Sequence, residues 1–167
     1  MKSCFFIGHR EVSSEILPVL VKSVEHHIVK YGVTEFVVGN YGGFDRMAAK
    51  AVIAAKKQYT EITLSLLIPY HPAEHQVALP PGFDNTFYPP GMEKIPRRFA
   101  IIRANRYMVD HVDCLIAYAW HPASNARDLV EYAERRATAG LISVHNLAQA
   151  HGNSIKLARS CEISARK

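Results

Sequence analysis

The stretch EFVVGNYGGFDRMAAKAV, residues 35–52, decides the fold. It passes from an apolar run typical of a buried strand, through a turn with three glycines, into an alanine-rich helix. A strand that ends in such a turn and continues as a helix is the first half of a βαβ unit, which builds parallel sheets. Because the first turn of a helix carries unpaired N–H groups, the turn also favours an anion.

The same alternation continues on both sides of this stretch. Further strand-like runs begin at residues 2, 62, 113 and 141, and helical periodicity covers residues 14–31, 45–57, 96–112 and 126–138. Short apolar runs between such helices are typical of a parallel sheet that is covered on both faces. We therefore expect an α/β fold, a Rossmann-like three-layer sandwich with a mainly parallel five-stranded sheet.

Residues 69–96 interrupt this regularity. Seven of the nine prolines of the chain fall there, with little hydrophobic periodicity. The segment is predicted to be an irregular loop, either a binding loop or an ordered surface wrap. We expect one Rossmann-like domain over residues 1–150, this loop included, followed by a short C-terminal tail over residues 151–167.

The composition is that of an ordinary globular protein, with 49% hydrophobic and 21% charged residues. No apolar run approaches the roughly 20 residues that span a bilayer, and the N-terminus enters strand-like sequence without the regions of a signal peptide. Cys4 and Cys114 fall inside strand-like runs, where we expect small core residues and no disulfide. These features predict a cytoplasmic protein with no membrane partner. The net charge of +5 favours an anionic partner such as a nucleotide, a nucleic acid or an acidic surface.

The fold predicts where a ligand binds. In open parallel sheets, ligands bind beyond the carboxyl ends of the strands, where the strand order reverses. This rule selects the loops GHRE, GNYGGFD, YHPAEH and AWHPASN, which follow the first four predicted strands. Three of these loops run into helices, so we expect three helix N-termini to converge on an anion. The second loop has neither G-x-G-x-x-G nor GK[ST], so a standard NAD or ATP site is disfavoured and no cofactor is expected.

The first two loops supply most of the expected anion contacts. Gly39, Gly42 and Gly43 are predicted to adopt positive φ and to let the backbone approach a ligand closely. Arg10, two residues after Gly8, offers a guanidinium suited to phosphate or carboxylate.

Two residues of these loops have two interpretations each. Asp45 is either the N-cap of the following helix or a contact to a ligand hydroxyl. His9 bonds either the ligand or a loop carbonyl.

The loop AWHPASN and the helix before it supply further candidates. Trp120 is a stacking wall for a base in one interpretation, with His121, Ser124 and Asn125 as polar contacts. In the other, Ser124 or Asn125 only caps the following helix. Asn105 lies on the apolar stripe of the helix over residues 96–112.

The amide of Asn105 either faces the ligand or ties down the proline-rich loop. Arg106 flanks this stripe and is a candidate to reach the pocket. The apolar side of the same helix is either core or the surface of a homodimer. The segment HPAEH suggests zinc, but it is not HExxH, Pro72 breaks any helix there and no third ligand is evident, so no metal site is expected.

Three segments together resemble a known superfamily: CFFIGHR, GNYGGFDRMAAKAV and RANRYMVDHVDCLIAYAWHPASNARDLVEYAERR. They are similar to the SLOG (Smf/DprA–LOG) superfamily, and most of all to its small DUF1273 or YpsA-like members of bacteria and phages. The resemblance covers nearly all of residues 3–146. It implies a Rossmann-like fold and a nucleotide or nucleotide-derived ligand over the strand ends. It does not imply one activity, because the superfamily includes ligand sensors, a DNA-binding recombination mediator and nucleotide-cleaving LOG enzymes.

The chain departs from the LOG enzymes where their chemistry is carried. Met108 and Asp113 keep the expected spacing, but the glycine-rich PGGxGT motif and its glutamate, which should begin at Ala119, are replaced by AWHPASNARD. A phosphoribohydrolase needs a carboxylate to steady an oxocarbenium-like sugar and to activate water. The remaining candidates for this carboxylate are Asp45 and Glu131.

The leading hypothesis is therefore binding of a nucleotide-derived small molecule without turnover. The alternatives are a nucleoside-monophosphate N-glycosidase and, less favoured, single-stranded nucleic-acid binding through RRFAIIRANRY. The expected ligand contacts are Gly8, His9, Arg10, Gly39, Asn40, Gly42, Gly43, Asp45, Asn105, Arg106, Trp120, His121, Ser124 and Asn125.

Overall fold

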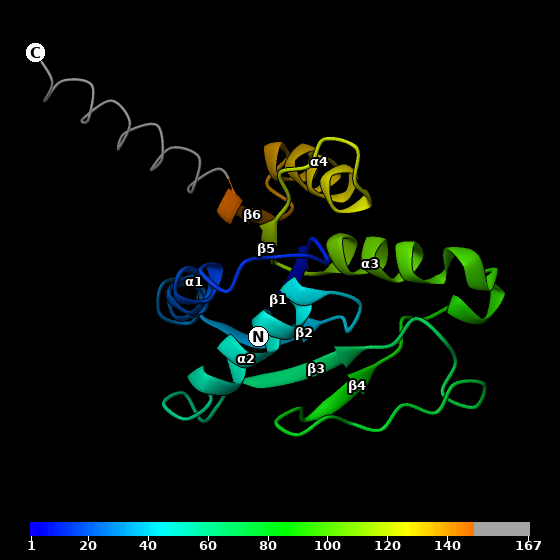
Figure 1. Cartoon of the computed structure of the whole chain (residues 1–167), viewed down its shortest axis with the longest axis horizontal. Coiled ribbons are helices and arrows are strands. Elements are labelled where there is room, and N and C mark those ends of the chain that lie inside the picture. The colour runs from blue at the N-terminus through cyan, green and yellow to red at the C-terminus, as the bar shows by residue number, and fades with distance from the viewer. Residues whose placement is uncertain (149–167) are drawn as a thin grey trace, which may run out of the picture.

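The computed structural model describes residues 1–148, and the predicted tail over residues 151–167 lies outside them. Helices and strands alternate along the described chain, except that β4 follows β3 directly (Figure 1). Two 3-10 turns, Met92–Lys94 and Arg97–Phe99, precede α3. The elements are β1 (Lys2–Gly8), α1 (Ile16–Tyr31), β2 (Val33–Val38), α2 (Gly43–Ala55), β3 (Thr63–Leu67), β4 (Asn85–Phe87), α3 (Ala100–His111), β5 (Cys114–Tyr118), α4 (Asn125–Thr138) and β6 (Ser143–Asn146).

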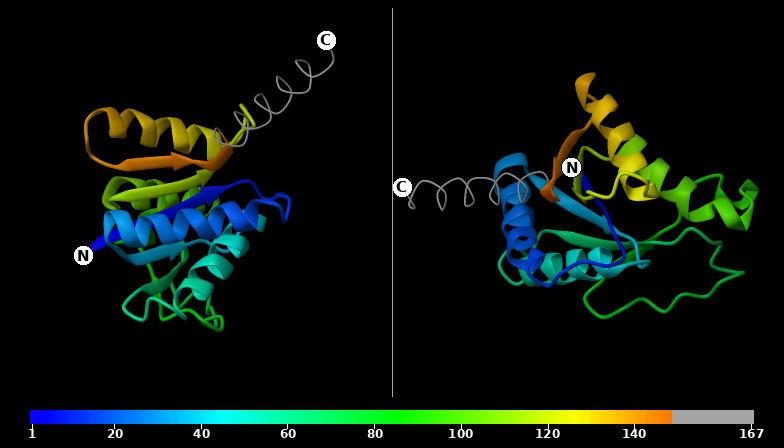
Figure 2. Two further views of the ribbon diagram at one scale, coloured as in Figure 1. Left: turned by 90° about the vertical axis from the view of Figure 1, so that its left-hand side faces the viewer. Right: turned by 45° about the horizontal axis from the view of Figure 1, so that its top comes forward.

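One parallel sheet of six strands, in the order β4-β3-β2-β1-β5-β6, organises the molecule. The chain first builds the sheet outward from β1 to β4 and then returns to the other side of β1 with β5 and β6. The left view of Figure 2 shows part of this order, from the orange β6 through the yellow-green β5 to the blue β1. The predicted α/β, Rossmann-like fold is confirmed, and the strand order reverses between β1 and β5.

The predicted count of five strands is wrong, because β4 lies inside the segment that was expected to be an irregular loop. It has three residues, pairs with β3 only, and is flanked by prolines. Asp84 fixes its start: its carboxylate accepts the N–H of Leu64 at 2.7 Å and pairs with Lys56 Nζ at 2.6 Å. A short edge strand held by distant residues leaves little periodic signal in its own sequence.

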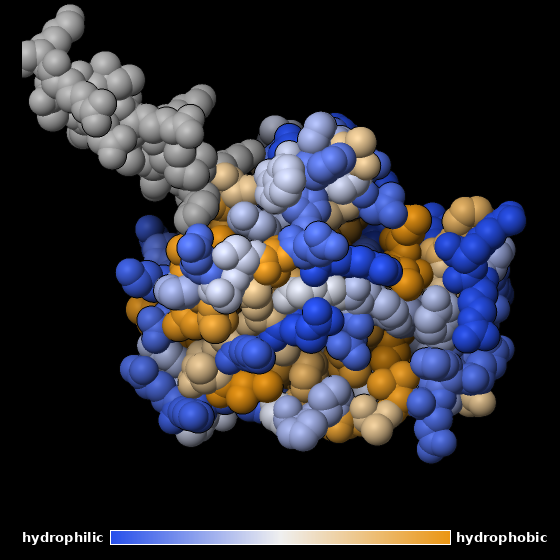
Figure 3. Space-filling model, in the orientation of Figure 1, coloured by the Kyte–Doolittle hydropathy of each residue, from blue (hydrophilic) through white to orange (hydrophobic). Residues whose placement is uncertain are grey.

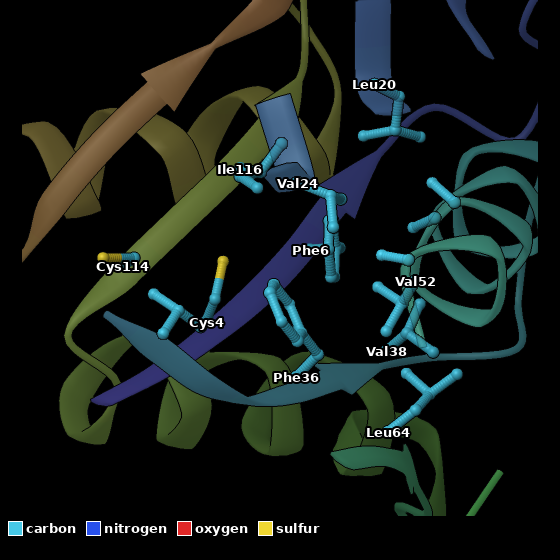
Figure 4. Close-up of a cluster of buried hydrophobic side chains, with 14 of the residues drawn as sticks. Cys4, Phe6, Leu20, Val24, Phe36, Val38, Val52, Leu64, Cys114 and Ile116 are labelled. Carbon is cyan, nitrogen blue, oxygen red and sulfur yellow. The ribbon is translucent and has the colours of Figure 1, made fainter. Parts of the chain in front are cut away.

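Helices cover both faces of the sheet, as a sandwich requires. Alternate residues of β1 point to opposite sides: Cys4 and Phe6 pack with α1 and α2, whereas Phe5 and Ile7 pack with α3 and α4. Figure 4 shows Phe6 and Phe36 between the sheet and Val52 of α2. Cys4 and Cys114 are buried register partners, which confirms them as core residues.

The apolar side of α3 belongs to the core. Ala104, Met108 and Val109 are buried against the sheet, so this side is not available for the predicted homodimer. Across residues 1–148, no helix is both long and apolar enough to cross a membrane.

Candidate functional site

A cavity of about 270 Å³ opens at the carboxyl ends of β1 and β2. Residues of the loops after β1 and β2 line it, together with the first residues of α4 and one side of α3. The rule for open parallel sheets selected this rim, and the cavity lies beside the point where the strand order reverses. Arg10 and the Gly39–Gly42 turn line the same cavity.

Close backbone contact joins the first two loops. The N–H of Gly43 donates to the carbonyl of Arg10 at 2.7 Å, and the N–H of Phe44 donates to the carbonyl of His9 at 3.3 Å. A Cβ on Gly42 would lie 2.9 Å from the Cα of Arg10, closer than non-bonded carbons approach. These glycines are therefore required by the lack of space beside Arg10.

The predicted positive φ at Gly39, Gly42 and Gly43 is wrong. Within the described residues, positive φ occurs only at Gly32, Gly82, Gly91 and Gly140. Gly42 has an extended backbone with φ −161°, which any residue adopts. A missing Cβ and a positive φ both select glycine, so the sequence alone did not separate the two causes.

Asp45 is the central acidic group of the cavity. It lies in the first turn of α2, but the residue that caps this helix is Gly42, so of the two interpretations of Asp45 the N-cap role is wrong. Its carboxylate instead accepts the N–H of Tyr41 at 3.0 Å, and a Cβ on Gly39 would lie 2.8 Å from its Oδ2. Burial, only partly offset by the Tyr41 hydrogen bond and by Arg46, raises the pKa of Asp45 to about 6. A carboxyl with this pKa changes its charge near neutral pH and is suited to accept or donate a proton.

Arg10 supplies the positive charge. Among the described residues that line the cavity, it is the only lysine or arginine. Its guanidinium is exposed and forms no hydrogen bond or ion pair with any described residue. The five N–H donors of this group remain free for an anion in the cavity.

The N-terminus of α4 faces the same space. Ser124 caps the helix: its Oγ accepts the N–H of Arg127 at 3.1 Å and donates to the carbonyl of His121 at 3.0 Å. The capping interpretation of Ser124 is confirmed, and Ser124 also lines the cavity. The N–H groups of Asn125 and Ala126, next in the chain, have no acceptor among the described residues. They point the positive end of the helix dipole toward this rim.

One side of α3 forms the apolar wall. Ile101 and Ile102 line the cavity, and Leu129 of α4 lies with them. Asn105 is half-buried in this wall, and its amide has no hydrogen-bond partner within residues 1–148. It does not tie down the proline-rich loop, so of its two interpretations only the one that faces the cavity agrees with the structure.

His9 holds a neighbouring loop in place. Its Nε2 accepts the backbone N–H groups of Trp120 at 3.0 Å and His121 at 3.2 Å, so this ring nitrogen carries no proton. Burial, with a smaller effect of nearby His121, lowers the pKa of His9 and favours this neutral state. His9 therefore accepts hydrogen bonds from N–H groups of the loop after β5, whereas a bond to a loop carbonyl was expected. It also lines the cavity.

Five predicted contacts lie apart from the cavity lining. Trp120 is 60% exposed and packs edge-on against His9, and His121 and Asn40 are exposed as well. Gly43 contacts the backbone of Arg10 and does not line the cavity. Arg106 lies over the ring of Tyr132, 3.1 Å from its centroid, and lines a separate hollow with Arg103.

Glu131 is not at the cavity either. It is exposed on α4 and pairs with Arg127 at 3.0 Å. Of the two carboxylates considered for catalysis, only Asp45 lines the cavity.

Two other expected contributions are missing from the cavity lining. No residue of α1 lines the cavity, and the N–H groups of Gly43 and Phe44 at the start of α2 donate to the first loop, so within the described chain only the N-terminus of α4 offers open N–H groups there and not three helix N-termini. The loop after β3 does not line the cavity either. The described residues hold no group of three or more His, Cys, Asp and Glu side chains that could hold a metal.

Two arginines of the segment RRFAIIRANRY pack against aromatic rings of the protein. The end of the molecule where the segments before α3 lie is strongly hydrophilic (Figure 3). Arg97 stacks on Tyr70 at 5.0 Å and Arg98 on Phe99 at 4.7 Å. These rings are therefore already paired with a cation.

Tyr41, Ile102 and Leu129 also line the cavity, although they are not among the contacts predicted from the sequence. Tyr41 lies inside the glycine turn that was singled out, and this position was the available signal. Burial, with smaller effects of Tyr70 and Asp45, raises the pKa of Tyr41 to about 12, so its phenol is a neutral hydrogen-bonding group. Ile102 and Leu129 come from two helices, and no local pattern indicates that they share a wall.

In comparisons with known proteins, the chain matches no protein-family model and no curated protein.

Asp45 leads to a prediction about stability. Its pKa is raised on folding, so its contribution to stability is fully present below about pH 4 and is lost as the pH rises through about 6. Asp45→Asn keeps an acceptor for Tyr41 but removes the charge. We compare the free energy of unfolding of the variant with that of the wild type. The difference, variant minus wild type, should be about 2–3 kcal/mol larger at pH 7.5 than at pH 4.

Urea denaturation at several pH values measures this difference. Asp128→Asn, which removes an exposed carboxylate, is the matched control and should change by less than about 1 kcal/mol. A difference between Asp45→Asn and the wild type that does not vary with pH would contradict the buried, uncompensated state of Asp45.

Proposed function

We propose that this chain binds a nucleotide or a nucleotide-derived small molecule in the cavity at the carboxyl ends of β1 and β2. The observation that carries the proposal is the shared position of three features: the unpaired guanidinium of Arg10, the open N–H groups at the start of α4, and the buried carboxyl of Asp45. The first two favour an anion, and the third favours a hydroxyl or amino group on the same molecule.

The anionic end of the ligand fits between Arg10 and α4. A phosphate oxygen there accepts from the guanidinium and from the N–H groups of Asn125 and Ala126. Charge-assisted hydrogen bonds of this kind contribute about 1.5–3 kcal/mol each when buried. Asp45 repels a second anion when ionised, which restricts the phosphate to the Arg10 side of the cavity.

The sugar and base fit the rest of the space. Asp45 is an acceptor for ribose hydroxyls, as carboxylates commonly are in nucleotide sites. Ile101 and Ile102 offer an apolar surface for a flat base, and the unpartnered amide of Asn105 is able to hydrogen-bond its edge. The volume of about 270 Å³ matches the lower end of small-molecule pockets, so a mononucleotide fits better than a dinucleotide.

The resemblance to the SLOG superfamily supports the same class of ligand, and a metabolite-sized ligand agrees with the cytoplasmic location that the sequence predicts. The free N–H groups of α4 support the same proposal, because the sequence predicts an anion at the N-terminus of the helix that follows AWHPASN.

Arg10 gives the direct test. Calorimetry with ribonucleoside mono- and diphosphates, cyclic nucleotides and ADP-ribose should identify a binder, and Arg10→Ala should weaken its affinity at least tenfold, about 1.4 kcal/mol. Arg135→Ala, which removes an exposed arginine on the last turn of α4, is the matched control and should bind like the wild type. Failure of the folded protein to bind any of these compounds would overturn the proposal.

A second candidate function, cleavage of the N-glycosidic bond of a nucleoside monophosphate, is favoured by Asp45 alone. A buried carboxyl with a pKa of about 6 beside a sugar is suited to act as an acid or base. In this case, chromatography should detect free base from the bound nucleotide, and Asp45→Asn should abolish its release while binding persists. Binding by the wild type with no released base over long incubation leaves the chain a binding protein.

A further inference from the structure

A second cavity, of about 350 Å³, lies between the C-terminal half of α3 and the sheet. Its floor is formed by side chains of β1 to β4, and its wall by α3 with Phe87 of β4. None of its residues lines the cavity at the strand ends, so it is a separate space. The floor is polar, with Glu35, Thr63, Ser65 and Asn85 in place of the apolar residues found elsewhere on this face of the sheet.

Glu35 is the charged group of this cavity. It is half-buried on β2 and forms no hydrogen bond or ion pair with any described residue. Within residues 1–148, no lysine or arginine lines the cavity, although the chain as a whole has a net charge of +5. The cavity thus presents a negative charge without a counter-charge on an otherwise basic protein.

The other polar groups offer mainly lone pairs. The hydroxyl of Ser3 donates to Asp113 at 3.2 Å, that of Thr63 to the carbonyl of Thr34 at 3.5 Å, and that of Ser65 to Asn85 at 3.4 Å. Their hydrogens are therefore already used, and their oxygens face the space as acceptors.

His111 adds to the same pattern. Its Nδ1 lies 2.8 Å from the carbonyl oxygen of Tyr107. Because a carbonyl only accepts, Nδ1 is the donor and carries the proton. In the neutral ring, Nε2 therefore has a lone pair. The remaining donors are the amide of Asn85 and the hydroxyl of Tyr107.

Aromatic rings complete the wall. Tyr107 stacks on His111 with ring centroids 3.9 Å apart, and the ring centroid of Phe87 lies 6.1 Å from that of Tyr107. The faces of such rings attract cations and pack against methylene groups.

We propose that this cavity binds a primary alkylammonium ion of the diamine or polyamine class. An ammonium group has three N–H donors and no acceptor, which is the complement of the carboxylate and lone pairs on the floor. Its alkyl chain lies against the rings of Phe87 and Tyr107. Among the described residues, this cavity holds no group of three His, Cys, Asp or Glu side chains that could bind a metal ion.

Putrescine is the probe that tests the site, with binding followed by calorimetry and by saturation-transfer NMR. The wild type should bind it, and Glu35→Gln should weaken binding at least tenfold while its circular dichroism and thermal midpoint stay unchanged. Glu15→Gln, which removes an exposed carboxylate at the start of α1, is the matched control for net charge and should bind putrescine normally.

Butane-1,4-diol, which has the same chain length without charge, should not bind. No binding of putrescine to the wild type, equal binding by folded Glu35→Gln, or equal binding of the diol would each overturn the proposal. Arg10→Ala should leave putrescine binding unchanged, so this result is independent of the nucleotide site.

Discussion

The contact between the loop after β1 and the turn after β2 determines the geometry of the site. The carbonyls of His9 and Arg10 accept the first N–H groups of α2, and the glycines at 42 and 43 leave no Cβ to separate the two backbones. A side chain at either position would push Arg10 away from α2. Because this contact fixes the backbone of Arg10, its unpaired guanidinium shares one cavity with the carboxyl of Asp45 and the first residues of α4.

Hydrogen bonds also join the loops at the ends of the next strands, toward the β6 edge of the sheet. His9 accepts two N–H groups from the loop after β5, and buried Asn146 at the end of β6 both donates to the carbonyl of Ala119 and accepts its N–H. The loops that end four neighbouring strands are thus linked by hydrogen bonds in the order of the strands themselves. Asp45 is the exception: its burial without an ion pair lowers stability near neutral pH, as is common for residues retained for binding or catalysis.

Much of the fold was predictable because hydrophobic periodicity is a local property. The stretches around Phe5, Val37 and Ile116 are continuous apolar runs, and the glycine at 32 ends α1 as expected. The misses share one physical cause, namely dependence on residues far along the chain. β4 exists because Asp84 pairs with Lys56, and Arg106 turns away from the cavity because Tyr132, on another helix, stacks with it.

The site was predictable to the level of its loops and less so to its individual side chains. The rule for parallel sheets selected the rim, and Gly8, Arg10, Gly39, Asp45 and Asn125 all line the cavity. It did not reveal that His9 would be occupied by backbone N–H groups, or that Trp120 would point away. Those outcomes depend on where folding places the backbone of the loop after β5, which brings the N–H groups of Trp120 and His121 within hydrogen-bond distance of His9 Nε2.

A two-dimensional amide NMR titration with ribonucleoside 5′-monophosphates tests the central claim most directly. The account predicts that the shifted backbone amides cluster at residues 8–10, 39–45 and 124–126, with the largest changes at Asn125 and Ala126, whose N–H groups have no acceptor in the described structure. Shifts confined to other surfaces, or no shifts in a protein whose spectrum is that of a folded chain, would contradict it.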